Sequence, residues 1–203
     1  MRKLVLTAAA ALALAVSAHA QAPGSVAPAN VQPGAYKIEP NHTRVLFAVS
    51  HFGFTTYYGE FVGASGSLDL DPKDIGKSRL DVSVPVSGIS TPSEKLTGEL
   101  KDPDWFDAAK FPTISFKSTA IAATGADTAD VTGDLTMHGV TKQVTLKAKF
   151  NAAGVSPVDK AYTTGFEVSG HVKRTDFGVS KYAPYVGDDV RLIISAAFER
   201  SPS

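Results

Sequence analysis

The sequence has 203 residues, with 20 basic and 20 acidic side chains, 43% hydrophobic residues and no cysteine. A chain of this length can form one large all-β domain. The absence of cysteine excludes disulfides and thiol chemistry, and the balanced charge argues against a nucleic-acid surface, which needs an excess of Lys and Arg. We therefore expect one domain that is stabilised by its apolar core, with no nucleic acid among its partners.

Residues 1–20 have the pattern of an export signal. Arg2 and Lys3 precede an apolar run from Leu4 to Val16, and Ala18-His19-Ala20 has small residues at the two positions that a signal peptidase reads. The apolar run is short for a transmembrane helix, and no second run follows. We predict a cleaved signal peptide, a periplasmic location and no stable membrane insertion. A membrane anchor is the alternative.

Residues 21–34 (QAPGSVAPANVQPG) are rich in Pro, Ala and Gly without periodicity, which predicts a disordered leader. The folded domain is expected over residues 35–203. Its first strands are predicted at Tyr36 to Ile38 and at Thr43 to Phe52, where apolar residues recur.

The segment from Tyr57 to Leu70 is expected to form one long strand. It contains Gly59, Gly63 and Gly66, and glycines at this spacing mark the bulges or bends that curl a sheet into a barrel. Alternating apolar residues predict further strands at Leu80 to Val86, Ile114 to Ala120, Thr164 to Lys173 and Val190 to Phe198.

One helical passage interrupts the strands. Thr91-Pro92-Ser93-Glu94 matches a capping box, which predicts Thr91 as the N-cap and Pro92 at the first helical position. Asp102-Pro103-Asp104 is expected to begin a second turn that carries Trp105 and Phe106. These two turns would plug or flank one end of a barrel.

The stretch from Gly133 to Phe150 predicts a hairpin, because apolar and polar residues alternate on both sides of His138-Gly139. Gly139 tolerates positive φ, so a tight reversal is expected there. A two-residue and a four-residue loop both place Leu135 and Val144 on one face, so the register stays open.

About eight strands with hairpin-length links and one helical insertion predict an all-β fold, a closed antiparallel β-barrel. An open sandwich is the alternative. The length of the strands and their internal glycines favour the barrel.

The sequence gives little support for catalysis or metal binding. A zinc site needs three or four converging ligands, and no two of His42, His51, His138 and His171 lie within four residues of each other. No Gly-x-Ser-x-Gly elbow lies between a strand and a helix. Paired carboxylates stay open, although nothing indicates them. We expect no catalytic residues, no metal and no cofactor.

Small residues at apolar positions leave volume that Leu or Ile would fill. They are Ala48, Gly63, Ala64, Gly133, Gly170, Ala196 and Ala197. A barrel with such an interior can hold an elongated apolar ligand. The same residues also suit a tapered, filled core. Both interpretations remain open at this point.

A set of motifs spread from Ala35 to Phe198 resembles the YceI-like family. The motifs are Tyr36-Lys37-Ile38 leading to His42, Val45-x-Phe47-x-Val49-x-His51-x-Gly53, Gly59-x-Phe61, Trp105-Phe106-Asp107, Phe111-Pro112-Thr113-Ile114-x-Phe116-x-Ser118, Gly133-x-Leu135-Thr136-Met137-His138-Gly139-Val140-Thr141-Lys142 and Arg174-x-x-Phe177-Gly178.

This resemblance implies a lipocalin-like barrel in the periplasm that binds a polyisoprenoid or a related long-chain amphiphile, such as an isoprenoid quinone, a fatty acid or a fatty amide. It does not fix the ligand. The residues that it suggests for the polar end are His42, His51, His138 and Arg174. The aromatic residues that we expect to contact the chain are Phe47, Phe61, Trp105, Phe106 and Phe116.

Three functions remain open. A carrier of such a lipid, the first choice, predicts a continuous apolar tunnel. An enzyme that acts on the lipid predicts converging polar groups in that tunnel, and a stress-related exported module predicts a filled core. The sequence leaves the oligomeric state open, with a homodimer as one option. Ligand entry is expected past the segment from Thr91 to Asp107.

Overall fold

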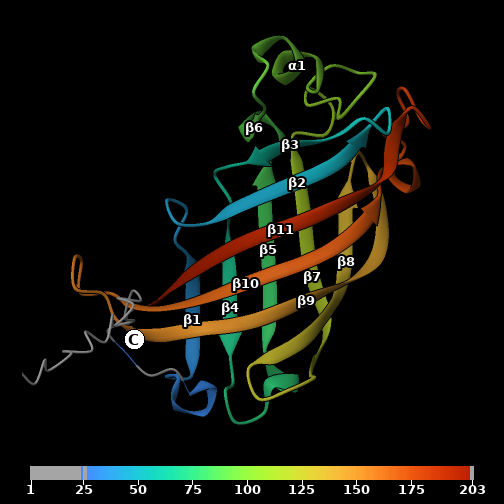
Figure 1. The fold of residues 1–203 in the computed structure, drawn as a ribbon. Helices are drawn as coiled ribbons and strands as arrows, with labels where there is room; N and C mark the ends of the chain where they lie inside the picture. Colours follow the sequence, from blue (N-terminus) through green and yellow to red (C-terminus); the bar gives the residue numbers. More distant parts are fainter. Residues whose placement is uncertain (1–23, 25–26, 202–203) are drawn as a thin grey trace, which may run out of the picture.

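The computed structural model describes residue 24 and residues 27–201, so the predicted signal peptide lies outside the described residues. This part of the chain is almost entirely strand (Figure 1). The strands are β1 (Gly34–Ile38), β2 (Arg44–His51), β3 (Thr55–Phe61), β4 (Ser65–Leu70), β5 (Arg79–Pro85), β6 (Ile89–Ser90), β7 (Thr113–Ala123), β8 (Thr128–Met137), β9 (Val140–Val155), β10 (Tyr162–Lys173) and β11 (Val186–Arg200). The short helical elements are η1 (Pro28–Asn30), η2 (Ile75–Lys77), η3 (Val86–Gly88), α1 (Glu94–Glu99) and η4 (Arg174–Phe177).

The sheet closes on itself. Its order runs β1-β4-β5-β7-β8-β9-β10-β11, and β1 also pairs with β11 through Ile38 and Phe198. All of these pairings are antiparallel. The prediction of a closed antiparallel barrel of about eight strands is therefore confirmed, and the open sandwich is excluded.

The strands β2, β3 and β6 extend the wall of the barrel toward α1. The long β11 pairs with β1 near its C-terminal end and with β2 over the rest of its length, so β1 and β2 are two halves of one bent strand. The strands β3 and β4 are related in the same way. The single strand expected from Tyr57 to Leu70 breaks at Gly63, whose φ of 79° is unfavourable for residues with a side chain.

The hairpin of β8 and β9 has a two-residue turn. Met137 pairs with Val140, and His138 and Gly139 have φ angles of 53° and 75°. Such a turn matches the twist of the two strands. Of the two loops that the sequence left open, the structure has the shorter one, and Leu135 and Val144 both face the interior of the barrel.

The helix α1 begins two residues later than expected. Its N-cap is Ser93, whose Oγ accepts a hydrogen bond from the Leu96 amide at 3.3 Å. The prediction of Thr91 as N-cap and Pro92 as first helical residue is wrong, because the Thr91 hydroxyl closes the preceding loop and accepts from the Ser93 amide at 3.2 Å. The helix and the turns that follow lie across one end of the barrel (Figure 1).

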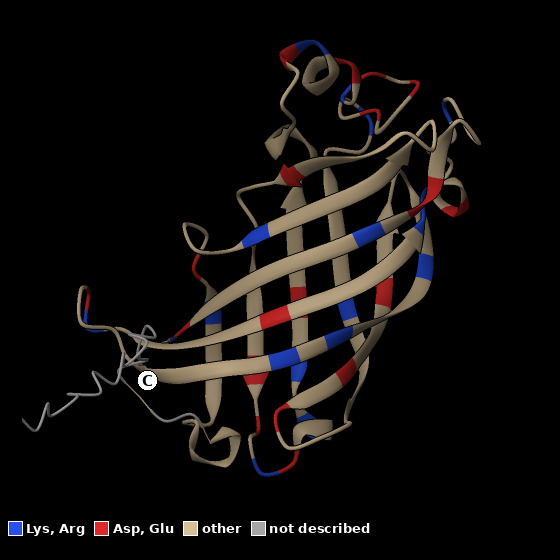
Figure 2. Cartoon of the chain, viewed as in Figure 1, with Lys and Arg blue, Asp and Glu red and all other residues tan. Residues whose placement is uncertain are grey.

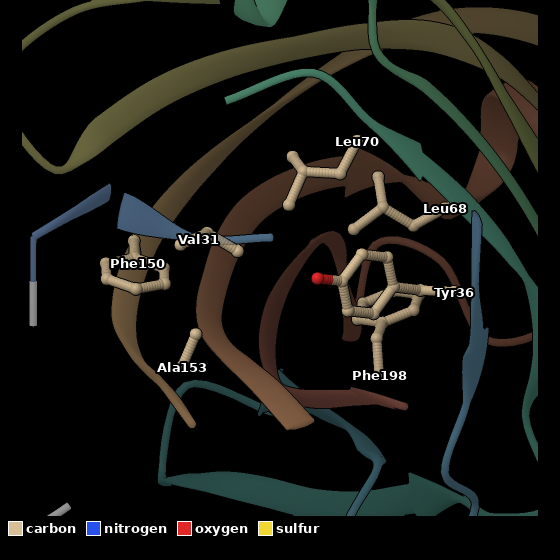
Figure 3. Packing of buried hydrophobic residues seen from close by; sticks show 7 residues of the cluster. All are labelled: Val31, Tyr36, Leu68, Leu70, Phe150, Ala153 and Phe198. Atoms are coloured by element: carbon tan, nitrogen blue, oxygen red, sulfur yellow. The ribbon is translucent and has the colours of Figure 1, made fainter. Parts of the chain in front are cut away.

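Residues near the chain start pack against the opposite end of the barrel. Val31 is only 4% exposed and joins a cluster that includes Tyr36 and Phe150 (Figure 3). The Tyr36 hydroxyl donates to the Gln32 carbonyl at 2.5 Å, and burial, with the neighbouring Tyr162, raises the pKa of Tyr36 to about 12. Residues 27–34 thus differ from the disordered leader expected over 21–34, because Val31 fills an apolar space at the barrel end.

Charged side chains of both signs are interspersed along the strands and loops of the barrel (Figure 2). Several opposite charges face each other across neighbouring strands, such as Lys117 and Asp81 at 3.2 Å and Lys147 and Asp130 at 3.5 Å. The interior is apolar in contrast, as the period-2 alternation requires.

Candidate ligand-binding site

A cavity of about 230 Å³ lies inside the barrel, and we call it the lower cavity. Its walls are mainly side chains of the barrel strands, and all are apolar except Thr43, Ser78 and Ser115. Phe116 of β7 and Phe61 of β3 are among the aromatic side chains of this wall. The lower cavity can therefore accommodate a hydrocarbon chain but offers little to a polar group.

A second cavity of about 270 Å³, the upper cavity, lies between the barrel and the α1 end. Leu96 and Leu100 from the α1 segment (residues 91–112) cover it. Its wall is also mainly apolar, but it contains side chains that carry polar atoms, namely His51, Tyr57, Trp105, Arg174 and Tyr182.

The two cavities share part of their walls. Four side chains line both of them and form a partition, namely Phe61, Met137, Val172 and Leu192. Each cavity is smaller than a typical ligand pocket of about 300–1,000 Å³, but together they fall in this range. A long ligand could occupy both if the partition side chains move, and Met137 is the most flexible of them.

Two of the seven small residues, Ala64 and Ala196, line the lower cavity. Gly133 and Gly170 do not leave empty space, because a Cβ atom there would overlap the side chains of Phe116 and Leu146. Gly63 lies at the bend between β3 and β4, and Ala48 of β2 and Ala197 of β11 border neither cavity. The small residues thus serve both the cavity and the tapered packing.

The aromatic residues expected to contact a ligand chain all line a cavity. Phe47, Trp105 and Phe106 line the upper cavity, Phe116 lines the lower one, and Phe61 lines both. The Phe61 ring packs against the Phe47 ring at 5.7 Å and edge-on against the Phe106 ring at 5.6 Å. This contact connects the α1 segment to the barrel wall.

Arg174 of η4 is only 6% exposed and is held by main-chain carbonyls. Its Nε donates to Gly187 at 2.8 Å, its Nη1 to Val179 and Lys181 at 2.7 and 3.0 Å, and its Nη2 to Val186 at 2.8 Å. Burial lowers the pKa of Arg174, and the nearby Asp188 carboxylate partly opposes this effect. The guanidinium group therefore fixes the loop between η4 and β11 and also borders the upper cavity.

The predicted histidines separate into two groups. His51 lines the upper cavity, where its ring meets the Phe52 ring edge-on at 4.5 Å. His42 is exposed in the β1–β2 connection, with Nδ1 2.6 Å from a Glu39 carboxylate oxygen. His138 sits in the β8–β9 turn, with Nδ1 3.1 Å from the Phe177 carbonyl oxygen. His42 and His138 border neither cavity.

The sequence analysis missed several cavity residues. Tyr57 and Tyr182 were not singled out, nor were the partition residues Met137, Val172 and Leu192. The inward position of Val172 and Leu192 follows from the alternation of their strands, so this signal was present. Tyr182 belongs to an irregular loop, where no periodicity reports side-chain direction.

In residues 27–201, no three His, Asp or Glu side chains come close enough to bind a metal ion. None of the helices in this part of the chain is long and apolar enough to cross a bilayer.

The YceI-like domain model matches residues 36–198. A UPF0312 protein of Pseudomonas aeruginosa strain LESB58 is 35% identical over 162 residues, which cover 79% of this chain and 84% of that protein. A UPF0312 protein of Azotobacter vinelandii is 34% identical over 157 residues, which cover 77% of this chain and 81% of that protein.

Solved structures show the same fold. The YceI protein of Campylobacter jejuni has a TM-score of 0.64 at 26% identity, covering 71% of this chain and 85% of its own. BcnA of Burkholderia cenocepacia has a TM-score of 0.71 at 23% identity, covering 79% and 98%. A polyisoprenoid binding domain from Saccharophagus degradans has a TM-score of 0.63 at 14% identity, covering 84% and 100%. With the family model and the two curated relatives, this places the chain in the YceI-like family.

Proposed function

We propose that this protein is a periplasmic binding or carrier protein that holds a polyisoprenoid or a related long-chain amphiphile inside its barrel. The observation that carries the proposal is the pair of adjoining apolar cavities, which share the partition of Phe61, Met137, Val172 and Leu192. Burial of a hydrocarbon chain there is favourable by about 25 cal/mol per Å² of apolar surface. The structural neighbour named as a polyisoprenoid binding domain supports the same ligand class.

The ligand is oriented by the difference between the two cavities. The chain occupies the lower cavity, where nearly all side chains are apolar, and the polar end lies in the upper cavity beside Trp105 and Arg174. Isoprenoid quinones, fatty acids and fatty amides all have this shape. Two of the residues that line the upper cavity, Phe52 and Tyr182, are 47% and 57% exposed.

We propose binding rather than catalysis. The Arg174 guanidinium donates to four main-chain carbonyls, which leaves it little capacity to act on a substrate. Within residues 27–201, no three His, Asp or Glu side chains come close enough to hold a catalytic metal ion. The proposed periplasmic location rests on the N-terminal sequence pattern.

Native mass spectrometry of the protein purified from the periplasmic fraction tests this function. A stoichiometric adduct that organic extraction identifies as a long-chain lipid is the expected result. If the protein stays free of ligand after incubation with isoprenoids, quinones and fatty amides, the carrier function is wrong. Recovery of the protein only from the cytoplasm would refute the location.

A further inference from the structure

Trp105 has a buried hydrogen-bond donor without a partner in the described residues. Its side chain is 6% exposed, it lines the upper cavity, and its Nε1 donates to no atom of residues 27–201. Buried polar groups in native structures almost always have a partner. The other unpaired buried atom of these residues, Thr164 Oγ1, borders neither cavity. Trp105 therefore has an unused hydrogen-bond donor at the wall of the upper cavity.

The groups packed on the indole ring do not pair with its N–H group. The Arg174 guanidinium carbon lies 5.9 Å from the ring centroid, and this group has only donors. On another side, the Tyr182 ring packs edge-on with its centroid 6.0 Å away. Because an indole N–H can only donate, the missing partner has to be an acceptor.

We propose that Trp105 Nε1 donates a hydrogen bond to an uncharged oxygen, a carbonyl or a hydroxyl, at the polar end of the bound amphiphile. This inference rests on the proposed function and assigns the chemical class of the ligand's headgroup. An ionised phosphate or carboxylate would need several donors in so apolar a cavity. Four of the five Arg174 N–H groups already donate to carbonyls, so Arg174 has little free capacity to bind an anion. Trp105 thus selects the headgroup, whereas the sequence suggested only a chain contact.

The chain contains a single tryptophan, so a ¹⁵N-indole label reports on Trp105 alone. Three probes with the same chain but different ends are compared, namely hexadecanamide, hexadecane and hexadecyl phosphate. We expect hexadecanamide to shift the indole N–H resonance downfield and hexadecane to leave it near its free position. The amide should bind about five- to tenfold more tightly than the alkane, as one net hydrogen bond predicts.

Two variants identify the donor. Trp105→Phe removes the N–H group, and its amide-to-alkane preference should fall to about one while hexadecane still binds. Phe106→Leu changes the apolar wall of the same cavity without removing a donor, so it should keep the preference. If Trp105→Phe does not fold, the wild-type protein still identifies the donor, because its indole N–H resonance shifts when hexadecanamide binds and stays in place when hexadecane binds.

The outcomes separate this inference from the function on which it rests. If amide and alkane bind equally and the indole N–H resonance does not move, the headgroup assignment is wrong and the carrier function stands. Tighter binding of hexadecyl phosphate than of hexadecanamide would show an anion site instead. If no probe binds, the proposed function fails and this inference fails with it.

Discussion

Arg174 is a structural residue at the border of the ligand site. Two of its four hydrogen bonds go to carbonyls of the loop between η4 and β11, and the other two go to carbonyls at the start of β11. Arg174→Ala leaves these carbonyls without their donor, so the free energy of unfolding should fall by about 3 kcal/mol or more. Arg174→Lys should lower the free energy of unfolding nearly as much, because an ammonium group cannot form the same set of hydrogen bonds as the planar guanidinium group. Urea-induced unfolding measures both changes.

Arg191→Ala is the matched control, because Arg191 is exposed on β11. It should change the free energy of unfolding by less than about 0.5 kcal/mol. If Arg174→Ala instead has wild-type stability but loses hexadecanamide binding, Arg174 is a headgroup ligand and not a support of the loop.

Glu39 organises the connection between β1 and β2. Its Oε1 accepts from the Asn41 amide at 2.9 Å, and its Oε2 accepts from the His42 amide at 2.7 Å. Burial alone would raise the pKa of Glu39, but these hydrogen bonds, with those of the Asn41 and His42 side chains, outweigh it and lower the pKa below the ordinary 4.5. The carboxylate therefore stabilises the fold above about pH 4.5, and this contribution is lost as the pH falls through the lowered folded-state pKa.

We predict that Glu39→Gln lowers the free energy of unfolding by about 1 kcal/mol at pH 7. The difference from wild type should shrink as the pH falls through the lowered folded-state pKa of Glu39, since the wild-type carboxylate becomes protonated there. Urea unfolding at a series of pH values measures it. Glu60→Gln removes only a partly exposed ion pair with Arg44 at 3.6 Å, so it should show a much smaller difference at every pH. If the difference in free energy of unfolding between Glu39→Gln and wild type persists unchanged at pH 2, the charge of Glu39 does not cause that difference.

The elements differ in how well the sequence predicts them. Strict alternation and the His138-Gly139 turn were enough to predict the hairpin of β8 and β9. The predicted N-cap of α1 was wrong because two hydroxyl residues, Thr91 and Ser93, both suit a helix start. The Thr91 hydroxyl bonds within the loop before the helix, so Ser93 becomes the N-cap. Gly63 indicated a bend in the sequence. It did not indicate that one strand ends there and another begins, because β3 pairs with β2 whereas β4 pairs with β1.

The α1 segment is connected to the loop before β11 by an ion pair. Lys181 Nζ lies 2.8 Å from Asp104 Oδ2, and the adjacent residues Tyr182 and Trp105 both line the upper cavity. The hydrogen bond to Asp104 raises the pKa of Lys181, which favours the charged form of the lysine. We infer that this pair keeps the α1 segment closed over the ligand.

Asp104→Asn should therefore increase the dissociation rate of hexadecanamide about two- to fivefold, a small effect because the pair is largely exposed. Stopped-flow fluorescence of Trp105 measures the rate, and the increase should shrink at high salt. Lys95→Ala removes the 3.7 Å ion pair with Glu99 within α1 and should leave the rate unchanged. An unchanged rate in Asp104→Asn would place ligand exit elsewhere.

For the whole molecule, the alternation of strands and the family motifs predicted the closed barrel with its apolar interior. The carrier function predicted one continuous apolar tunnel, but the structure has two adjoining cavities instead. The partition side chains Phe61, Met137, Val172 and Leu192 come from four different strands, and their meeting depends on barrel closure. Similarly, His42 and His138 belong to turns, where a motif position does not tell whether the side chain faces the interior.

The lower cavity provides the test of whether the barrel interior holds the ligand chain. Ala196 and Ala197 are neighbours on β11, and only Ala196 lines the lower cavity. Ala196→Leu adds apolar atoms to empty space, so the free energy of unfolding should stay within about 1 kcal/mol of wild type or rise. Ala197→Leu adds the same atoms to the opposite face.

If the chain occupies the lower cavity, Ala196→Leu should weaken hexadecanamide binding roughly tenfold, because chain and side chain compete for one volume. The affinity for octanamide, which has half the chain length, should fall less. Its polar end stays at Trp105 and its chain reaches less far into the barrel. Ala197→Leu should bind both amides like wild type. Isothermal titration measures the affinities. If Ala196→Leu binds hexadecanamide as tightly as Ala197→Leu does, the chain does not use the barrel interior, and the binding site is confined to the upper cavity.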